Sequence, residues 1–424
     1  MTTSKNLRFI HFSDLHLGVE THGKRDPETG VSSQIQDFLN CLDHLVKTAI
    51  TEQVDMVLFA GDAFHSLRPT PLCVREFLKW LLTLADNQIP VVLIAGNHDL
   101  PLARGDASPL DLVAVLKNPF LHFQRRPGWI SVTTKSGSVP IFCLPYVSTH
   151  QLLTTEEIFS ARKDQIRLTA QELLSQFLET KARQRDVSDG PSILLAHLWV
   201  ENAELSGSEE FLSETTEPVI PLSHLQNLGF CYAALGHIHR SQVLGDKDRP
   251  VVYAGSLARI AFDEEDQEKG FYLVELKDDK NGWKTTSLQF LPSPTRRFVT
   301  LKFDVREQKN PTEFVLRAIE SGTRLEGAVV RATIFATQDQ QRGLDRVRIR
   351  NALESKADVV QFVRVEVPDY QALSGLDSAE WERWTQQSPL ELLNEWLDRT
   401  KKDLTEEKRT KIMALAKKLM EGGG

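Results

Sequence analysis

The sequence predicts an α/β fold, in which β-strands and α-helices alternate along the chain. Three apolar runs, "RFIHFSD", "MVLFAGD" and "VVLIAGN", have the length and composition of buried strands. The two segments between these runs repeat apolar residues at a spacing of three or four, which is typical of amphipathic helices. Each run also ends in a polar residue. The pattern therefore predicts a sheet that collects polar side chains at one edge.

The elements can be predicted in order along the chain. The first helix is expected from Ile35 to Ala49, and the second from Val74 to Ala85. Polar helical sequence from about 151 to 188 separates this region from later, shorter apolar runs. These runs are "VPIFCLPY", "SILLAHL", "CYAALGHI", "VVYAGS" and "GFYLVEL". They predict a second sheet that stacks on the first, with helices on the outside.

The second half of the chain predicts two further units. "FLPSPTRRF", residues 290–298, contains two prolines and marks a boundary after a first domain of residues 1–292. Residues 295–370 alternate strand-like and helix-like segments, as in a small α+β domain. The tail, residues 378–424, has apolar stripes among many lysines and glutamates and is expected to be helical.

Composition places the chain in a broad class. Its 424 residues, 41% of them hydrophobic, suffice for two or three domains with real cores. The N-terminus has no apolar secretion signal, and no stretch approaches the roughly 18 apolar residues of a membrane helix. We therefore expect a soluble, cytoplasmic protein. The net charge of −8 gives no global attraction for DNA, so a DNA-binding function has to be argued from a site.

The four cysteines carry no motif. They are scattered, form no CxxC pair and lie inside apolar runs. We interpret Cys41, Cys73, Cys143 and Cys231 as buried thiols rather than disulfide or metal-binding residues.

Candidate metal ligands follow five of the predicted strands. They are Asp14 and His16, then Asp62, then Asn97, then His197, and finally His237 and His239. Ligands of open α/β sheets gather outside the carboxyl ends of the strands, so these residues are expected to meet in one crevice. Since Asp14 and His16 are two residues apart, as are His237 and His239, a strand with a period of two would direct both members of each pair to one side. Gly61 and Gly96, each directly before a candidate ligand, are expected to allow a sharp turn.

The donor set indicates two divalent metal ions. Imidazole, carboxylate and amide oxygen without thiolate favour Mn²⁺, Mg²⁺, Fe or Zn²⁺. One ion would take Asp14, His16 and His239, the other Asn97, His197 and His237, with Asp62 bridging. Two ions about 3.5 to 4 Å apart can clamp the attacking and leaving oxygens of a phosphoester and activate a bridging water. The predicted reaction is phosphoester hydrolysis.

Three further residues are predicted to take part in catalysis. His98 follows the ligand Asn97 and is expected to face the scissile phosphate, where it would stabilise charge or protonate the leaving oxygen. Asp99 is predicted to hydrogen-bond the His98 ring and fix its tautomer. His65, in "GDAFH", would supply a second donor from the opposite side.

Each of these signals is weak when taken singly. An aspartate at a strand end is more often a turn or cap residue, and a lone histidine is more often part of a core or a surface. That reading is kept for His11, His22, His44, His122, His150 and His224. The joint occurrence at five strand ends is what favours a metal centre.

Other charged and aromatic segments have simpler interpretations. The run "DEEDQEK", residues 263–269, is interpreted as a solvated loop. "QRRP" at 124–127 and "KARQR" at 181–185 fit either phosphate contacts or solvated surface. The tail tryptophans are either packing residues or anchors for a partner. They are Trp381, Trp384 and Trp396.

The order D-x-H, GD, GNHD, H and GHxH resembles the calcineurin-like metallophosphoesterase superfamily over residues 8 to about 240. This resemblance implies a four-layer sandwich of two stacked β-sheets flanked by helices, with two metals at one edge. A narrower resemblance, to the SbcD family of DNA repair nucleases, rests on "FIHFSDLHLG", "GDAFH", "IAGNHD", "YAALGHIHRSQVL" and residues 251–276. The segment "LWVENAEL" after His197 departs from that family.

The narrower resemblance implies specific roles for these residues and segments. The seven candidate ligands would bind two Mn²⁺, His98 would be catalytic and His65 would assist. Residues 295–370 would form a capping domain, and the C-terminal helices would bind the coiled-coil base of an SbcC-type ATPase. The nuclease domain would form a homodimer through its helices.

The implied activity is that of a nuclease in DNA repair, recombination and replication. It would be a 3′→5′ exonuclease on double-stranded ends and an endonuclease on single strands or hairpins. One alternative is a calcineurin-like phosphatase or cyclic-nucleotide phosphodiesterase, which would need neither a large cap nor a partner-binding tail. Another is a DNA-end-binding scaffold with a structural metal site, which the intact His98 disfavours.

Overall fold

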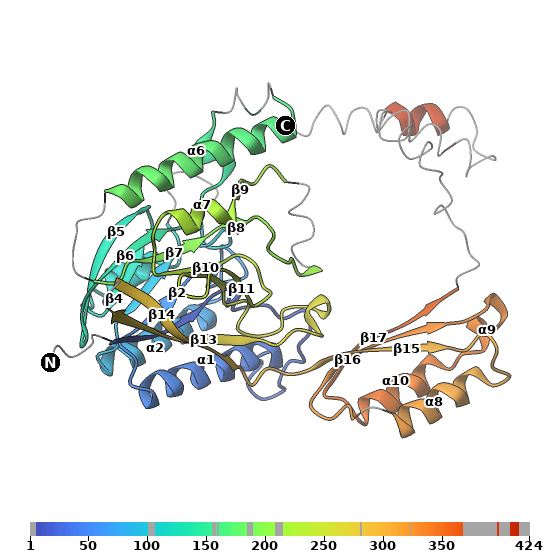
Figure 1. The fold of residues 1–424 in the computed structure, drawn as a ribbon. Helices are drawn as coiled ribbons and strands as arrows, with labels where there is room; N and C mark the ends of the chain where they lie inside the picture. The colour runs from blue at the N-terminus through green and yellow to red at the C-terminus, as the bar shows by residue number, and fades with distance from the viewer. Residues whose placement is uncertain are drawn as a thin grey trace.

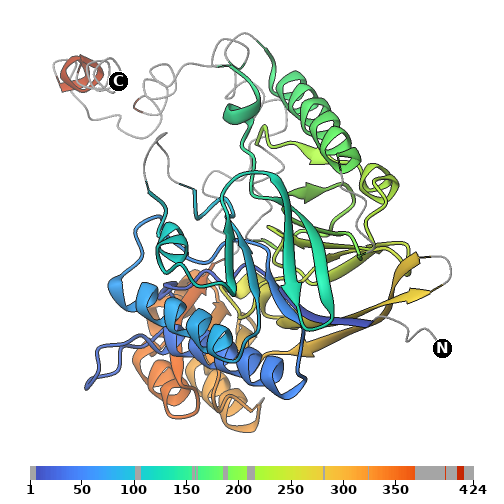
Figure 2. The same ribbon diagram turned by 90° about the vertical axis from the view of Figure 1, so that its left-hand side faces the viewer.

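The computed structural model describes residues 6–100, 107–154, 158, 161–184, 190–207, 215–279, 282–322, 324–367, 397 and 408–414. Its largest part contains two six-stranded sheets, and a smaller part contains a three-stranded sheet (Figure 1). The helices of the larger part lie on the two outer sides of the stacked sheets, as the turned view in Figure 2 shows.

The first sheet has the strand order β14-β13-β1-β2-β3-β4. Its strands are β1 (Asn6–Phe12), β2 (Met56–Phe59), β3 (Val91–Ile94), β4 (Leu121–Gln124), β13 (Gly270–Asp279) and β14 (Gly282–Pro292). Strands β1 to β4 are parallel, whereas β13 pairs antiparallel with both β1 and β14.

Helices α1 (Ser33–Thr51) and α2 (Pro71–Asp86) cover the outer face of the first sheet. The side chains of Ser32 and Thr70 cap their N-termini by accepting hydrogen bonds from backbone N–H groups. The apolar stripe of α1, which includes Phe38, packs in one core with Phe12 and Phe59 from the sheet. A short helix α3 (Asp111–Val115) precedes β4.

The second sheet has the order β11-β12-β10-β7-β6-β5. Its strands are β5 (Gly128–Thr134), β6 (Gly137–Leu144), β7 (Ile193–His197), β10 (Tyr232–Gly236), β11 (Gln242–Gly245) and β12 (Pro250–Tyr253). Helices α6 (Lys163–Arg183) and α7 (Leu222–Asn227) contribute Leu174, Leu178 and Leu225 to the core on its outer face. A short helix α4 (Thr149–Leu152) and a two-stranded sheet of β8 (Trp199–Val200) and β9 (Val219–Ile220) lie beside them.

A continuous apolar core joins the two sheets. Phe9, Leu58 and Val92 from the first sheet are in one buried cluster with Leu195 and Tyr232 from the second. The predicted fold of two stacked sheets flanked by helices is therefore confirmed. The placement of "GFYLVEL" in the second sheet is wrong, because this strand, β13, pairs with β1 in the first. An apolar run buried on both faces predicts a strand but does not identify its neighbour.

The small domain has its own sheet and core. The sheet is wholly parallel, with β15 (Phe298–Asp304), β16 (Val329–Phe335) and β17 (Val359–Glu366) in that order. It is connected by α8 (Pro311–Ser321), α9 (Gln338–Gly343) and α10 (Arg346–Glu354). Helical crossovers are what parallel neighbours require, so the arrangement is α/β rather than the predicted α+β. These elements lie within the proposed cap, residues 295–370.

The small domain contacts the larger one near Phe262 and through the segment that connects the two domains. Phe262, in the 3₁₀ turn η2 (Phe262–Glu264), packs with Phe298 and Val329. The Arg331 guanidinium lies 4.4 Å from the centre of the Phe262 ring. In the connecting segment, Arg296 forms an ion pair of 2.6 Å with Asp37 of α1.

The remaining predictions concern the cysteines, the tail and the membrane. All four cysteines are buried free thiols, as predicted. The tail prediction, residues 378–424, falls outside the described residues except for Leu397 and the helical residues 408–414, and the three tail tryptophans lie outside them. Among the described helices, none has the length and hydropathy of a membrane span.

Candidate metal centre

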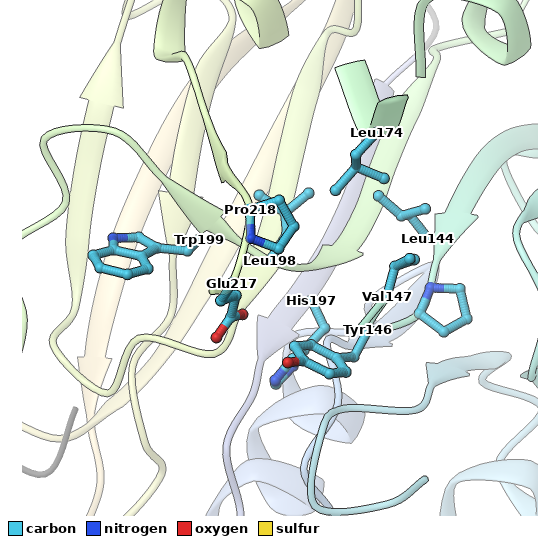
Figure 3. Close-up of a pocket in the computed structure, with 10 residues that line it drawn as sticks. Leu144, Tyr146, Val147, Leu174, His197, Leu198, Trp199, Glu217 and Pro218 are labelled. Carbon is cyan, nitrogen blue, oxygen red and sulfur yellow. The ribbon is translucent and has the colours of Figure 1, made fainter. Parts of the chain in front are cut away.

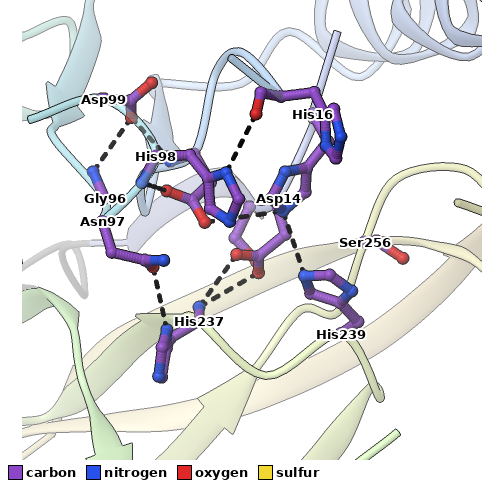
Figure 4. A network of polar contacts seen from close by, with 12 residues as sticks. Asp14, His16, Gly96, Asn97, His98, Asp99, His237, His239 and Ser256 are labelled. Carbon is purple, nitrogen blue, oxygen red and sulfur yellow. Dashed lines mark hydrogen bonds and ion pairs between the residues drawn. The ribbon is translucent and has the colours of Figure 1, made fainter. Parts of the chain in front are cut away.

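The seven candidate ligands come together where strands of both sheets end. Figure 4 shows Asp14, His16, Asn97, His237 and His239 among them. β1, β2 and β3 of the first sheet lead into the loops that carry Asp14, Asp62 and Asn97. In the second sheet, β7 ends at His197 and β10 ends one residue before His237. The sandwich thus places donors from distant parts of the chain in one buried cluster.

One group of donors surrounds His16. The side chains of Asp14, His16 and His239 offer donor atoms within 4.8 Å of one another, and all three residues are buried. The Nε2 atoms of His16 and His239 are 3.0 Å apart. Within the described part of the chain, His16 Nδ1 is also buried without a hydrogen-bond partner. A cation between these imidazoles would satisfy a nitrogen of each ring, because a metal accepts the lone pair of each.

A second group surrounds the Asn97 amide. Asn97 Oδ1 lies 3.0 Å from His197 Nε2 and 3.1 Å from His237 Nδ1. Asp62 stands between the two groups, with its Oδ2 atom 3.5 Å from His16 Nε2 and 3.6 Å from His197 Nε2. The geometry thus offers two neighbouring donor sets with one carboxylate in common.

The backbone at these positions is unusual. Asp14, His16, Asp62 and His237 have positive φ angles of 49°, 45°, 61° and 97°. Residues other than glycine rarely adopt this left-handed conformation, and it occurs mainly where the surrounding structure imposes it. The expectation that strand alternation aims Asp14 with His16 and His237 with His239 is wrong, because β1 ends at Phe12 and β10 ends at Gly236. The orientation of Asp14 and His16 instead follows from loop backbone whose N–H groups donate to Gly61 O and Asp62 O at 3.0 Å.

The two glycines serve different purposes. Gly61 has a φ of +95°, which fits the predicted turn. Gly96 has no positive φ, but a Cβ atom at this position would lie only 2.1 Å from Asp62 Oδ1. Gly96 is therefore required because the Asp62 carboxylate packs against its backbone.

The electrostatics of the cluster favour a bound cation. Burial raises the pKa of Asp62 well above its usual range, and the neighbouring carboxylates of Asp99 and Asp14 raise it further. Burial also raises the pKa of Asp14. The pKa values of His16 and His197 are lowered well below the usual range, chiefly by burial, so both imidazoles are neutral. Divalent cations bind neutral imidazoles, and their charge offsets the repulsion between crowded carboxylates.

The predicted contact between Asp99 and the His98 ring is wrong. The Asp99 carboxylate accepts hydrogen bonds from the backbone N–H groups of Asp62 at 2.8 Å, Ala63 at 3.0 Å and Gly96 at 3.0 Å. Burial raises the pKa of Asp99 to about 6. Its position fixes the two glycine-containing loops relative to each other, because each loop presents N–H groups to the same carboxylate.

The tautomer of His98 depends on a different partner. His98 Nδ1 lies 3.0 Å from the backbone carbonyl oxygen of His65, to which it donates. The backbone N–H of His98 donates to Asp62 Oδ1 at 2.8 Å. The His65 and His98 rings are nearly parallel, at 20°, with centroids 5.8 Å apart. His65 is exposed and His98 is half-buried, as is the ligand Asn97, whereas the other six candidate ligands are buried. His65, His98 and Asn97 therefore mark the side of the cluster that a substrate can approach.

Several polar residues near the site were not predicted from the sequence. Glu264 Oε1 lies 2.9 Å from His239 Nδ1, and Glu264 Oε2 lies 3.2 Å from Lys269 Nζ. Burial alone would raise the pKa of Glu264, but the Lys269 ammonium and His239 lower it to about 2. Both members of the pair are buried, so the interpretation of residues 263–269 as a wholly solvated loop is wrong. The sequence offered no sign of this, since both charges sit inside a run of charged residues.

A small pocket borders the second donor group (Figure 3). Glu217, another unpredicted residue, lies there with Oε1 3.0 Å from His237 Nε2. The Tyr146 ring lies beside both histidines, with centroid distances of 6.1 Å to His197 and 5.9 Å to His237. Burial and the nearby Glu217 raise the pKa of Tyr146, so its phenol stays protonated.

Comparison with known proteins gives a consistent result. Residues 7–241 match the family described as calcineurin-like phosphoesterase. The SbcCD nuclease subunit of Bacillus subtilis (strain 168) is 28% identical over 282 residues, which cover 64% of this chain and 66% of the relative. The protein of the same name from Escherichia coli (strain K12) is 26% identical over 277 residues, covering 65% of this chain and 66% of the relative.

An archaeal relative is similarly distant. The DNA double-strand break repair protein Mre11 of Methanocaldococcus jannaschii is 26% identical over 317 residues, covering 73% of this chain and 72% of the relative. The match to the two bacterial relatives spans 66% of the length of each. These similarities confirm the predicted resemblance to SbcD-type nucleases.

Proposed function

Because the chain belongs to the calcineurin-like phosphoesterase family, we propose that it is a metal-dependent phosphodiesterase that hydrolyses DNA. The observation that carries this proposal is the convergence of six nitrogen and oxygen donor residues around a seventh, Asp62, whose carboxylate is shared between two groups. A buried cluster of this kind is costly for a fold unless cations neutralise it.

The residues present fit two divalent ions. Asp14, His16 and His239 would hold one ion, Asn97, His197 and His237 the other, and Asp62 would contact both. The absence of thiolate among these donors favours Mn²⁺, Mg²⁺, Fe or Zn²⁺ over soft metals. Among these we propose Mn²⁺, because the chain resembles SbcD-type nucleases. When bound, the ions would supply Lewis-acid activation of a phosphoester and of the attacking water.

The side chains facing the substrate have distinct roles in this proposal. Nδ1 of His98 carries a proton and donates it in a hydrogen bond to the His65 carbonyl oxygen. The other ring nitrogen, Nε2, is therefore the atom that exchanges a proton with the leaving oxygen. His65, whose ring lies alongside, would assist in binding the phosphate. Asp99 would act only indirectly, by fixing the loops that carry Asp62 and His98.

The proposed substrate class is supported by the relatives. Two of them are called nuclease subunits and the third a double-strand break repair protein. Within the proposed hydrolysis of DNA, we further propose 3′→5′ exonuclease activity on double-stranded ends and endonuclease activity on single strands or hairpins. A phosphatase or cyclic-nucleotide phosphodiesterase is the alternative within the same family.

A comparison of substrates tests this proposal. Purified protein is incubated with Mn²⁺ and either an end-labelled DNA duplex or a chromogenic small phosphodiester, with chelator as control. We expect Mn²⁺-dependent shortening of the duplex. Cleavage of the small phosphodiester while the duplex stays intact would contradict the DNA proposal and favour the small-substrate alternative.

We also propose that the chain works as a homodimer with an SbcC-type ATPase, which would bind the C-terminal segment, residues 378–424. Support comes from the relatives named as parts of SbcCD and from the apolar stripes of the tail. Copurification with a large ATPase of this kind would be measured for chains with and without residues 380–421. Equal recovery with both chains would contradict a role of the tail in this interaction.

A further inference from the structure

A buried acidic side chain lies behind the His239 ring, on the side away from the candidate metal. Glu264 Oε1 contacts Nδ1 of the ring at 2.9 Å, whereas the ring's Nε2 faces His16 Nε2 at 3.0 Å. A neutral imidazole carries its proton on one nitrogen and a lone pair on the other. A carboxylate at Nδ1 therefore holds the proton there and leaves the Nε2 lone pair for a cation.

The position of the Glu264 carboxylate is fixed by further contacts. Its Oε2 atom accepts a hydrogen bond of 2.8 Å from the backbone N–H of Ile260 and lies 3.5 Å from the Ser256 hydroxyl. The same oxygen lies 3.2 Å from Lys269 Nζ. The carboxylate is therefore held from several directions and cannot turn away from the histidine without losing these partners.

Lys269 holds both the acid and the histidine. Its ammonium group, beside the Glu264 carboxylate, also donates to the backbone carbonyl of His239 at 2.9 Å and to the Gln267 side chain at 2.9 Å. One lysine thus fixes the backbone of His239, while the carboxylate that it neutralises fixes the ring.

Stability alone does not account for this ion pair. Removing an ammonium and a carboxylate from water is costly, and apolar residues of similar volume often stabilise a fold at least as well. The side chains of Glu264 and Lys269 are both 0% exposed. Burial of the Glu264–Lys269 pair costs free energy, and the Glu264 carboxylate contacts Nδ1 of His239. Orientation of the His239 ring explains the pair better than stability does.

We propose that Glu264, held by Lys269, is a positioning residue that presents His239 Nε2 to the metal ion bound with Asp14 and His16. The inference rests on the proposed metal-dependent function and adds to it a carboxylate–histidine–metal arrangement at the ion site that contains His239. The second site, with Asn97, His197 and His237, does not depend on Glu264.

Two variants test the proposal. The double substitution Glu264→Gln with Lys269→Met removes both charges together, so that no unpaired charge is left buried. Glu264→Asp keeps the charge but shortens the side chain, which withdraws the carboxylate from His239. Glu268→Gln is the matched control, because this carboxylate is exposed in the same loop. Thermal melting of each protein in chelator shows whether the metal-free chain is folded.

The primary readout is metal binding rather than activity. Calorimetric titration of metal-free protein with Mn²⁺ should give two sites in the wild type and in Glu268→Gln. In the double variant and in Glu264→Asp, the affinity of one site should fall by about 10- to 100-fold while the other is unchanged. Electron paramagnetic resonance at low loading should then show isolated Mn²⁺ in place of the coupled pair.

Two results would overturn the proposal. One is wild-type affinity at both sites in the folded variants. The other is an equal loss at both sites together with a lower melting temperature of the metal-free protein, which would show that the pair only supports the fold. DNA cleavage is measured separately on the same preparations. A selective loss of one site in a protein that cleaves no DNA would leave the positioning role intact and reject only the proposed function.

Discussion

Asp62 is the residue on which both donor groups depend. Its Oδ2 atom lies between His16 and His197, its Oδ1 atom accepts the His98 N–H, and its own N–H donates to Asp99. The residue is held in a left-handed conformation with a φ of 61°. Small changes in its surroundings are therefore expected to alter the whole site.

Gly96→Ala tests this dependence. The added Cβ atom would lie 2.1 Å from Asp62 Oδ1, so the carboxylate or the loop must move. We expect a weaker Mn²⁺ affinity, by at least about tenfold, and a loss of about 1–3 kcal/mol in the free energy of unfolding measured in chelator. Gly128→Ala is the control, since a Cβ atom there would have nothing within 4 Å. Equal Mn²⁺ affinity in both variants would show that Asp62 tolerates the displacement.

The burial of His11 predicts how the free energy of unfolding changes with pH. It is fully buried between the sheets, with Nδ1 2.9 Å from the Tyr232 hydroxyl, and burial lowers its pKa from 6.5 to about 3. Below pH 6.5, His11 binds a proton in the unfolded chain, whereas the folded chain keeps this imidazole neutral until the pH approaches 3. The stability that His11 contributes above pH 6.5 is therefore lost as the pH falls from 6.5 toward 3, by about 1.4 kcal/mol per pH unit.

The comparison is between the wild type and His11→Gln in chelator. Between pH 6.5 and 5, the free energy of unfolding should fall by about 2 kcal/mol more in the wild type than in the variant. Urea titrations at several pH values measure both curves. Parallel curves would mean that His11 does not titrate differently in the folded and unfolded chains.

At the residue scale, the sequence predicts the candidate metal ligands but not the residues that hold these ligands in position. The candidate ligands follow strands directly, so local patterns locate them. Asp99 and Glu264 are different, because their partners are distant in sequence or consist of backbone groups. No residue type signals such a contact, which is why Asp99 was predicted to bind a ring and Glu264 to face solvent.

At the scale of elements, the 3₁₀ turn η2 links the candidate site to the small domain. Glu264 at the end of the turn contacts His239, and Phe262 at its start packs against Phe298 with ring centroids 4.9 Å apart. Only Asp263 separates these two residues, so a displacement of Phe262 is expected to shift Glu264. Docking of the small domain and the orientation of His239 are therefore expected to be coupled.

Phe298→Ala measures that coupling. Loss of the packing against Phe262 should weaken Mn²⁺ binding at the site containing His239 by about 0.5–2 kcal/mol, a factor of roughly 2 to 30. Phe314→Ala, in an exposed position on α8 of the same domain, is the control. Calorimetric titration with Mn²⁺ gives both affinities. Identical Mn²⁺ affinities in the two folded variants would indicate that packing of the small domain does not affect the site containing His239.

The strands of the two large sheets that the sequence did not predict share one property. β4, β5, β11 and β14 are the outer strands of the two large sheets. They are only partly buried, so they lack the continuous apolar run that identified the inner strands. The apolar pattern therefore predicts the central strands of each large sheet, which lead to the candidate ligands, but does not predict the edge strands.

At the scale of the whole molecule, two sheets contribute to one centre. Asp14, Asp62 and Asn97 follow strands of the first sheet, and His197 and His237 lie at the ends of strands of the second. Neither sheet alone offers a complete donor set for two ions. The stacking of the sheets is thus part of the proposed chemistry as well as of the core, and chelation should lower the melting temperature of the intact protein.

The central claim is that this centre hydrolyses DNA with His98 as the proton-exchanging residue. The most direct test is the rate of Mn²⁺-dependent degradation of a labelled duplex by the wild type and by His98→Ala, with Mn²⁺ content measured in both. We expect equal Mn²⁺ content and a rate that falls by about 100-fold or more in the variant. An unchanged rate in His98→Ala would contradict the assignment.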